Sequence, residues 1–241
     1  MSDELNRRLH FLTKKYSISA GEVFGAGGDP MLRTHGGEFA LLPWRVERRF
    51  IELKNLIING TLEHISTLRF ASLTAGGDLF QQVGRELDLA AWLAGSSVVS
   101  LFAACSGNVA ANLVVKLAND VSVSIECSNT LPESTETIDR HEIIARRGVA
   151  SDRVVDTQVP QSSIYAFTGK GDARYTDTDA ELFGLSEAEI RLVRAAFAVL
   201  GNPAIGVEWN AAAGVIEKLI EAVKQSDATS SVVALRGGKQ K

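Results

Sequence analysis

The sequence predicts an α+β protein with a mostly antiparallel open sheet and helices packed on one face of that sheet. Three runs in close succession indicate the sheet, at residues 98–104, 112–117 and 121–127. The last run (VSVSIEC) alternates strictly, as a strand with one buried face does. Residues 118–120 (Ala-Asn-Asp) suit a tight antiparallel hairpin between the second and third runs. Helical patterns before and after these runs complete the α+β order.

The first 60 residues predict a helix, a loop, a short strand and a second helix. Apolar residues at helical spacing place the first helix at residues 3–15. Residues 20–37 are rich in glycine and contain a proline, so we expect a loop there. A short strand is expected at 39–42, and a helix at 47–58 that ends at Asn59-Gly60.

The rest of the chain carries both strand and helix signals. A short helix is expected at 87–93, and Ser186 is expected to cap a helix that reaches Leu200, where Gly-Asn-Pro stops it. A further helix is expected at 209–225. The remaining expected strands lie at residues 65–70, 142–146, 153–157, 163–168 and 231–235.

Composition narrows the class of protein. With 45% hydrophobic and 22% charged residues the chain is typical of a globular protein, and its net charge of -4 disfavours a phosphate-binding surface for nucleic acid. Cys105 and Cys127 lie in apolar alternating stretches, which suits buried thiols in a reducing compartment. The charged N-terminus lacks an apolar signal core, and no run has the ~18 apolar residues of a membrane span. We therefore expect a cytoplasmic protein with neither nucleic acid nor membrane as partner.

Three stretches together resemble the C-terminal domain of the Gfo/Idh/MocA family of NAD(P)-dependent sugar and cyclitol oxidoreductases. The first is residues 44–50 (WRVERRF), which continue into the helix that ends at Asn59-Gly60. The second is Gly76-Gly77 followed by residues 86–95 (ELDLAAWLAG), and the third is residues 142–149 (EIIARRGV). The resemblance implies a sheet domain over residues 39–236, preceded at 1–38 by a helix and Gly-rich loop that we interpret as a remnant of a cofactor domain. Residues 237–241 are expected to be a flexible tail.

Features that the family needs for hydride transfer are missing from this sequence. The glycine cluster at residues 25–28 follows no convincing strand and opens no helix, so it does not match a dinucleotide-binding turn. No Glu-Lys-Pro tripeptide is present. Alignment of residues 86–88 with the family places Gln81 and Arg85 where the family has its Asp and His. Gln does not titrate and Arg is a poor general base, so these two positions are interpreted as vestigial.

Several polar residues remain candidates for binding a ligand, and we assign no catalytic residue, cofactor site or metal site among them. Gln81 and Arg85 could hold a carboxylate or hydroxyl, or could be drifted residues on the wall of a vestigial cleft. His141 could be catalytic or a ligand, but a histidine at a strand edge is the preferred interpretation, since no second His or Cys lies nearby at metal-ligand spacing. The full candidate set is Gln81, Arg85, Asp88, His141, Asp152, Arg153 and Gln158.

Two functions follow from the resemblance and from what is missing. The first is a non-catalytic oligomerisation, accessory or sugar-binding module that needs no cofactor. It would form homo-oligomers through the sheet face, or pair with a full-length oxidoreductase, and it could bind a small sugar. Residues 98–104 and 121–127 are then expected to give this face a large apolar patch. The second is an enzyme: one subunit of a split NAD(P)-dependent sugar or cyclitol oxidoreductase whose partner supplies NAD(P), or a cofactor-free sugar-modifying enzyme.

Overall fold

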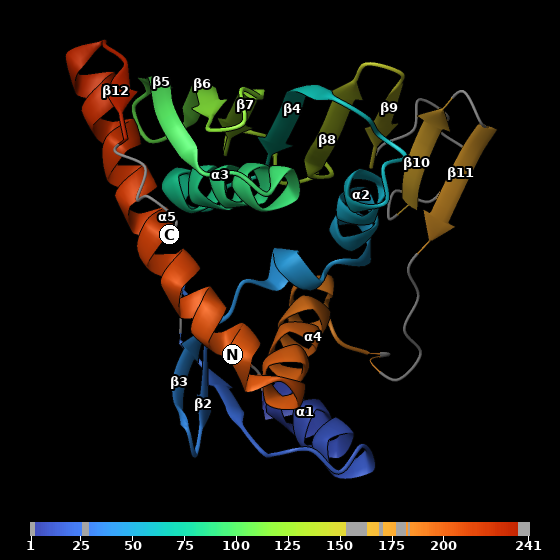
Figure 1. The fold of residues 1–241 in the computed structure, drawn as a ribbon. Coiled ribbons are helices and arrows are strands. Elements are labelled where there is room, and N and C mark those ends of the chain that lie inside the picture. The colour runs from blue at the N-terminus through green and yellow to red at the C-terminus, as the bar shows by residue number, and fades with distance from the viewer. Residues whose placement is uncertain are drawn as a thin grey trace. The chain divides into compact units, whose positions relative to one another are not determined.

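The computed structural model describes residues 3–25, 29–152, 163–168, 171–176, 182 and 184–235. The chain divides into two compact units. Unit 1 comprises Met1–Arg48 and Thr178–Val215, and unit 2 comprises Arg49–Asp177 and Ile216–Lys241. Figure 1 labels the helices and strands of both units. The expected strand at 153–157, residues 26–28 of the glycine cluster and the tail at 237–241 lie outside the described residues.

Unit 1 is built from helices around a small antiparallel sheet. Its sheet has the order β1 (Glu22–Phe24), β2 (Met31–Thr34) and β3 (Gly37–Ala40). The expected loop at residues 20–37 is therefore wrong. The strands have only three or four residues, too few for a clear sequence pattern, and Val23 and Leu32 are buried by packing against distant segments.

The helices of unit 1 follow the sequence signals more closely. Helix α1 (Asp3–Lys15) buries Leu5, Leu9 and Leu12, while Asn6 exchanges hydrogen bonds of 3.0 and 2.9 Å with the backbone of Val23. The 3₁₀ helix η1 covers Pro43–Val46. Helix α4 (Glu187–Gly201) begins at the expected cap, where Ser186 and Glu189 form a capping box.

Helix α5 spans Pro203–Thr229, so it begins six residues before the expected start near Trp209. Proline is well suited to the first turn of a helix, and the side chain of Asn202 accepts a 3.2 Å hydrogen bond from the backbone of Ala204. Its residues to Val215 belong to unit 1, and the others belong to unit 2. Among the described residues no single helix is long and apolar enough to cross a membrane. Helices α4 and α5 meet that condition only together, with a bend of 120° between them.

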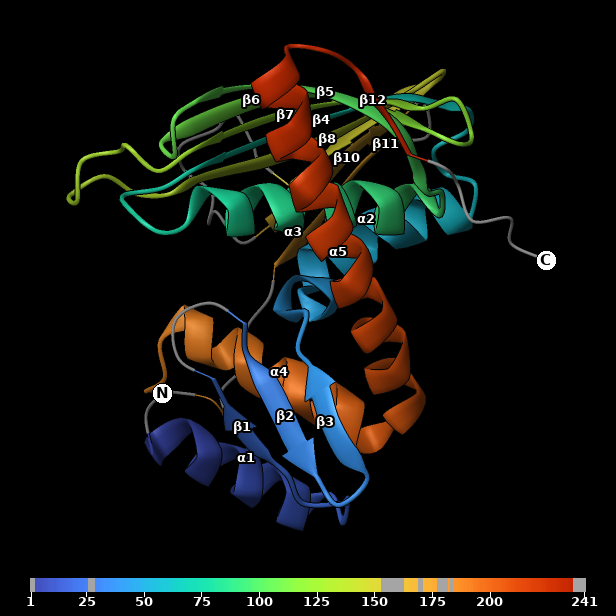
Figure 2. The ribbon, with the colours of Figure 1, turned by 90° about the vertical axis from the view of Figure 1, so that its left-hand side faces the viewer.

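Unit 2 is a nine-stranded sheet with helices on one face (Figures 1 and 2). In spatial order, its strands are β11 (Gly171–Thr176), β10 (Ser163–Thr168), β9 (Gly148–Ser151), β8 (Ile138–Ala145), β4 (Ile65–Leu73), β7 (Ser122–Ser128), β6 (Ala110–Leu117), β5 (Val98–Ser106) and β12 (Val233–Ala234). Strands β4 and β7 are parallel, whereas β4 and β8 are antiparallel. The sheet is thus mixed: β4 and β7 form a parallel pair among antiparallel neighbours, because β4 returns to β7 through a helix and two further strands. The expected hairpin at 118–120 is confirmed: it joins β6 to β7, and Asp120 takes a positive φ of 68°.

Helices α2 (Arg48–Ile58) and α3 (Leu79–Ala94) cover the inner face of this sheet. Helix α3 begins eight residues before the expected start near Leu87, because Asp78 caps it by accepting hydrogen bonds from the backbone of Phe80 and Gln81. Gln81 and Arg85 consequently lie within the helix rather than before it. Alternate residues of β4, β6 and β7 are buried beneath α3 and form the core of the unit.

Candidate functional site

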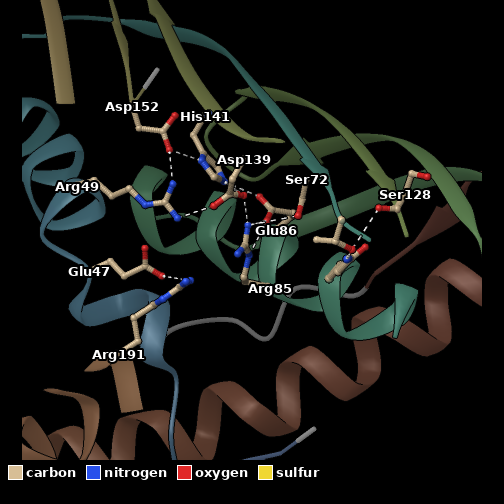
Figure 3. A network of polar contacts seen from close by, with 12 residues as sticks. Glu47, Arg49, Ser72, Arg85, Glu86, Ser128, Asp139, His141, Asp152 and Arg191 are labelled. Carbon is tan, nitrogen blue, oxygen red and sulfur yellow. Dashed lines mark hydrogen bonds and ion pairs between the residues drawn. The ribbon is translucent and has the colours of Figure 1, made fainter. Parts of the chain in front are cut away.

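Charged side chains gather on the inner face of the unit 2 sheet, where β8 lies next to α2 and α3 (Figure 3). We call this group the charge cluster. Its members are Arg49 of α2, Arg85 and Glu86 of α3, Asp139 and His141 of β8, and Asp152, which follows β9. Four separate segments of the chain therefore supply its six residues.

The sheet register explains why these residues meet. Asp139 and His141 are two residues apart in β8, so they point to the same face of the sheet. On the neighbouring strand they pair with Ser72 and Phe70 respectively. The backbone of His141 also fixes Asp152, since its N–H donates to a carboxylate oxygen of Asp152 over 2.7 Å and its carbonyl accepts from the Asp152 N–H over 3.2 Å.

His141 lies at the centre of the cluster, with both ring nitrogens facing carboxylates. Its Nδ1 is 2.6 Å from Oδ2 of Asp152, and its Nε2 is 2.8 Å from Oε2 of Glu86. All three side chains are fully buried. A neutral imidazole has only one N–H donor, whereas an imidazolium has two. The geometry therefore fits a positively charged His141.

The surroundings of His141 support the same protonation state. Burial by itself would lower its pKa, but the carboxylates of Asp152, Glu86 and Asp139 raise the pKa to about 10. The rings of Phe50 and Phe70 pack against the imidazole with centroid distances of 4.7 and 4.8 Å. His141 is thus a buried residue of a central strand, and the expectation of a histidine at a strand edge is wrong.

Two arginines neutralise the remaining charge. One oxygen of Asp139 accepts a hydrogen bond from Arg49, and the other accepts one from Arg85. Arg49 also donates to Asp152 over 3.0 Å, and Arg85 donates through Nε to Glu86 over 2.7 Å. Three carboxylates then balance two guanidinium groups and one imidazolium, as burial of charge requires.

The carboxyl pKa values reflect this balance. Burial alone would raise the pKa of Asp139, but Arg85 and Arg49 outweigh it and hold that pKa well below its usual range. Burial would likewise raise the pKa of Glu86, but Arg85 and His141 lower it. Asp139 and Glu86 therefore enter the balance as carboxylates at neutral pH.

The cluster contains the donor set of a metal site, but its charge is already balanced. Glu86, Asp139 and His141 each offer one ligand atom, all within 4.8 Å of one another. A divalent cation would require His141 to give up a proton and would lie beside the guanidinium of Arg85, which contacts both Glu86 and Asp139. The arrangement of Glu86, Asp139 and His141 is therefore better suited to a protonated His141 with two arginines as partners than to a bound metal ion.

The structure brings three of the sequence candidates together, namely Arg85, His141 and Asp152. Gln81 is exposed on the first turns of α3, and Asp88 is buried further along the same helix. Arg153 and Gln158 lie outside the described residues. Sequence reasoning missed Arg49, Glu86 and Asp139 as members of a site. The available signals were a Glu among the core residues of α3 and an Asp two residues before His141 on the same strand face.

The opposite, outer face of the sheet is mainly polar where the structure describes it. Leu101, Val123 and Ile125 of the two alternating runs point inward and are buried. On the outer face Val114 is 62% exposed and pairs with Phe102, and Arg69 lies 3.3 Å from Glu142. The other outward residues of the central strands include Thr67, Asn112, Lys116, Ser122, Ser124, Glu126 and Arg140. The expectation of a large apolar patch is wrong for this described part.

Comparison with known proteins shows a likeness in fold to oxidoreductases. Neither a protein-family model nor a curated protein matches the sequence. Many solved structures match, and oxidoreductases and dehydrogenases are among them. At this level the fold agrees with the resemblance to the Gfo/Idh/MocA family.

Three of these structures illustrate the match. An oxidoreductase domain protein from Kribbella flavida has a TM-score of 0.66 at 13% identity, covering 81% of this chain and 66% of its own. Levoglucosan dehydrogenase in complex with NADH and levoglucosan has a TM-score of 0.66 at 14% identity, covering 81% and 65%. Myo-inositol 2-dehydrogenase from Lactobacillus plantarum has a TM-score of 0.57 at 14% identity, covering 81% and 64%. The chain thus spans less than two thirds of the length of each, and the likeness concerns the fold alone.

Proposed function

We propose that this chain is a non-catalytic module derived from Gfo/Idh/MocA-type oxidoreductases, which binds a sugar-like ligand and associates with other subunits through its sheet. The observation that carries the proposal is the environment of Arg85. This residue stands at the position where the family resemblance implies an acid/base histidine, and it is held by Asp139 and Glu86. A guanidinium stays protonated far above neutral pH, so Arg85 cannot take a proton from a hydroxyl group.

The other titratable groups of the cluster are equally unsuited to proton transfer at neutral pH. His141 is enclosed between Asp152 and Glu86, and its raised pKa keeps the proton on the ring. A general acid or base works best when its pKa lies near the working pH. The lowered pKa values of Asp139 and Glu86 leave these groups as carboxylates whose charge is already neutralised.

The outer face supports a role in association. It combines small residues such as Ser122 and Ser124 with charges of both signs, and it has an apolar spot at Phe102 and Val114. Non-obligate interfaces are about as polar as the rest of a protein surface, so a polar sheet face is compatible with an assembly that forms and dissociates. A second copy of the chain is the partner we propose for it.

Native mass tests the association. The wild-type chain is measured by light scattering beside Val114→Lys, which adds a charge to the outer face, and beside Ile58→Lys, which adds one at the exposed end of α2. We expect a defined oligomer for the wild type and for Ile58→Lys, and a smaller mass for Val114→Lys. A monomeric wild type, or an unchanged mass for Val114→Lys, would contradict association through this face.

Catalysis is tested separately with NAD⁺ and NADP⁺ and a panel of sugars and cyclitols. We expect the purified chain to show no sugar-dependent reduction of NAD⁺ or NADP⁺, both at low concentration and at concentrations at which it forms oligomers. Reduction that depends on a sugar and is lost in Arg85→Gln would overturn the non-catalytic assignment.

A further inference from the structure

The carboxylate of Asp139 is held in the way that proteins hold a bound anion. Its two oxygens accept hydrogen bonds from two different guanidinium groups, those of Arg49 and Arg85. Arginine is the residue best suited to recognising carboxylates, because its planar donors match their geometry. We propose that Arg49 and Arg85 form a carboxylate-binding site which Asp139 occupies from within the chain, and that a sugar acid displaces it. The proposed recognition of the carboxylate does not depend on the proposed function. The proposed recognition of the hydroxylated chain rests on the sugar-binding role proposed above.

The two guanidinium groups are positioned without Asp139. Arg49 donates to Asp152 over 3.0 Å, and its guanidinium lies 4.3 Å from the ring centroid of Phe50. Arg85 donates to Glu86 over 2.7 Å and contacts the hydroxyl of Ser72 over 3.5 Å. Both arginines would therefore stay in place when the carboxylate of Asp139 leaves. A site arranged in advance in this way loses little entropy when a ligand binds.

Asp139 lies on the accessible side of the cluster. Its side chain is 14% exposed, and those of Arg49 and Arg85 are 15% and 19% exposed, whereas His141, Glu86 and Asp152 are fully buried. Asp139 is also the second residue of β8 and follows exposed residues at 132–137. A change of its side-chain rotamer would open the site without loss of the strand pairing. Exchange of one carboxylate for another also leaves the net charge of the cluster unchanged.

Gln81 gives the site a second polar group for the polyol chain of the ligand. It is exposed and lies four residues before Arg85 in α3, so both residues share one face of the helix. An amide side chain can both donate to and accept from hydroxyl groups. The ligand chemistry that fits is a carboxylate attached to a hydroxylated chain, as in aldonates and uronates.

Thermal unfolding of Asp139→Ala in gluconate, acetate and glucitol tests the site. Gluconate and glucitol share the hydroxylated chain, but only gluconate has the carboxylate. We expect gluconate to raise the Tm of this variant by about 3–6 °C for each tenfold increase above its Kd, with a weaker effect of acetate and none of glucitol. The matched control is Glu142→Ala. Glu142 also lies in β8 between two arginines, Arg69 and Arg140, but on the outer face, so its removal should create no carboxylate response.

Titration calorimetry of the wild type decides whether the native chain uses the site. We expect gluconate to bind at least tenfold more weakly than to Asp139→Ala, because Asp139 must first be displaced, and we expect Arg85→Gln to abolish binding. Absence of a carboxylate-specific effect on Asp139→Ala would overturn the site, as would binding confined to that variant. Should Asp139→Ala fail to fold, the wild type and Arg85→Gln titrations carry the test alone. Oxidation of gluconate would overturn the non-catalytic role but leave the site standing, whereas loss of gluconate binding would leave the native-mass result untouched.

Discussion

Nδ1 of His141 lies 2.6 Å from Oδ2 of Asp152, and neither side chain is exposed to solvent. Together with Glu86 on the opposite side of the ring, Asp152 holds a charged imidazolium within the sheet core. Six charged residues from four segments thereby form one neutral group beneath the sheet. Loss of a single member leaves its partners buried without compensation, which costs more than the loss of one favourable contact.

Because His141 is protonated in the folded state, we expect the fold to become less stable as the pH rises into the alkaline range. Its folded-state pKa is raised from 6.5 to about 10, so its contribution is fully present below pH 6.5 and is lost as the pH rises towards 10. We expect the free energy of unfolding of the wild type to fall by up to about 1.4 kcal/mol per pH unit in this range. Urea denaturation between pH 6 and 10.5 measures the fall. His141→Gln, which has no such proton, should show a shallower dependence, and equal slopes for both proteins would refute the charged histidine.

Arg85 should stabilise the fold far more than an exposed arginine in a similar pair. Arg85→Gln leaves the buried carboxylates of Glu86 and Asp139 short of a partner, and we expect it to lower the free energy of unfolding by about 2–4 kcal/mol. Arg69→Gln removes the outer-face partner of Glu142, where Arg69 is 52% exposed, and should cost about 0–1 kcal/mol. Chemical denaturation of both variants provides the comparison, and similar losses would argue against a buried charge cluster.

Gly84 allows α3 and α5 to approach closely within unit 2. A Cβ atom at this position would lie 2.8 Å from Cγ2 of Ile216 and 3.0 Å from Cδ1 of Ile220. We expect Gly84→Ala to destabilise unit 2 by about 1–3 kcal/mol through overpacking, less the gain in helix propensity. Gly214 in α5 has no atom near its Cβ position, so Gly214→Ala should instead raise stability by up to about 1 kcal/mol. Thermal unfolding distinguishes the two, and a stabilised Gly84→Ala would show that the helices are less close.

Ser226 joins the end of α5 to the sheet. Its hydroxyl is fully buried, accepts from the backbone N–H of Ala103 over 2.9 Å and donates to the carbonyl of Ser231 over 2.7 Å. Ser226→Ala leaves both backbone groups without this partner, and we expect a loss of about 1–3 kcal/mol. Ser124→Ala on the exposed outer face is the control and should change stability by less than about 0.5 kcal/mol. Hydrogen exchange at the Ala103 amide would report the loss locally, and unchanged protection there would contradict it.

Sequence reasoning located most elements but few of their boundaries. The hairpin at Asn119-Asp120 and the cap at Ser186 were predicted because turn and capping chemistry depends on adjacent residues. The start of α3 was missed although Asp78 is a good cap, since Gln81, Gln82 and Arg85 interrupt the apolar pattern of its first turns. Strands β1 and β2 were missed because each is too short for periodicity to indicate a strand, whereas the strand expected at residues 39–42 overlaps β3.

The sequence by itself determined that strands and helices are segregated and that β7 has one buried face. It also determined that Arg85 cannot act as a general base, since that follows from the chemistry of the side chain alone. Only the tertiary structure decided that Arg85, His141 and Asp152 meet, and that Arg49, Glu86 and Asp139 complete their charge balance. In the sequence, Arg49 lies 90 positions before Asp139 and 103 positions before Asp152. Their contacts depend on the parallel pairing of β4 with β7 and on the register of β8, which no local pattern encodes.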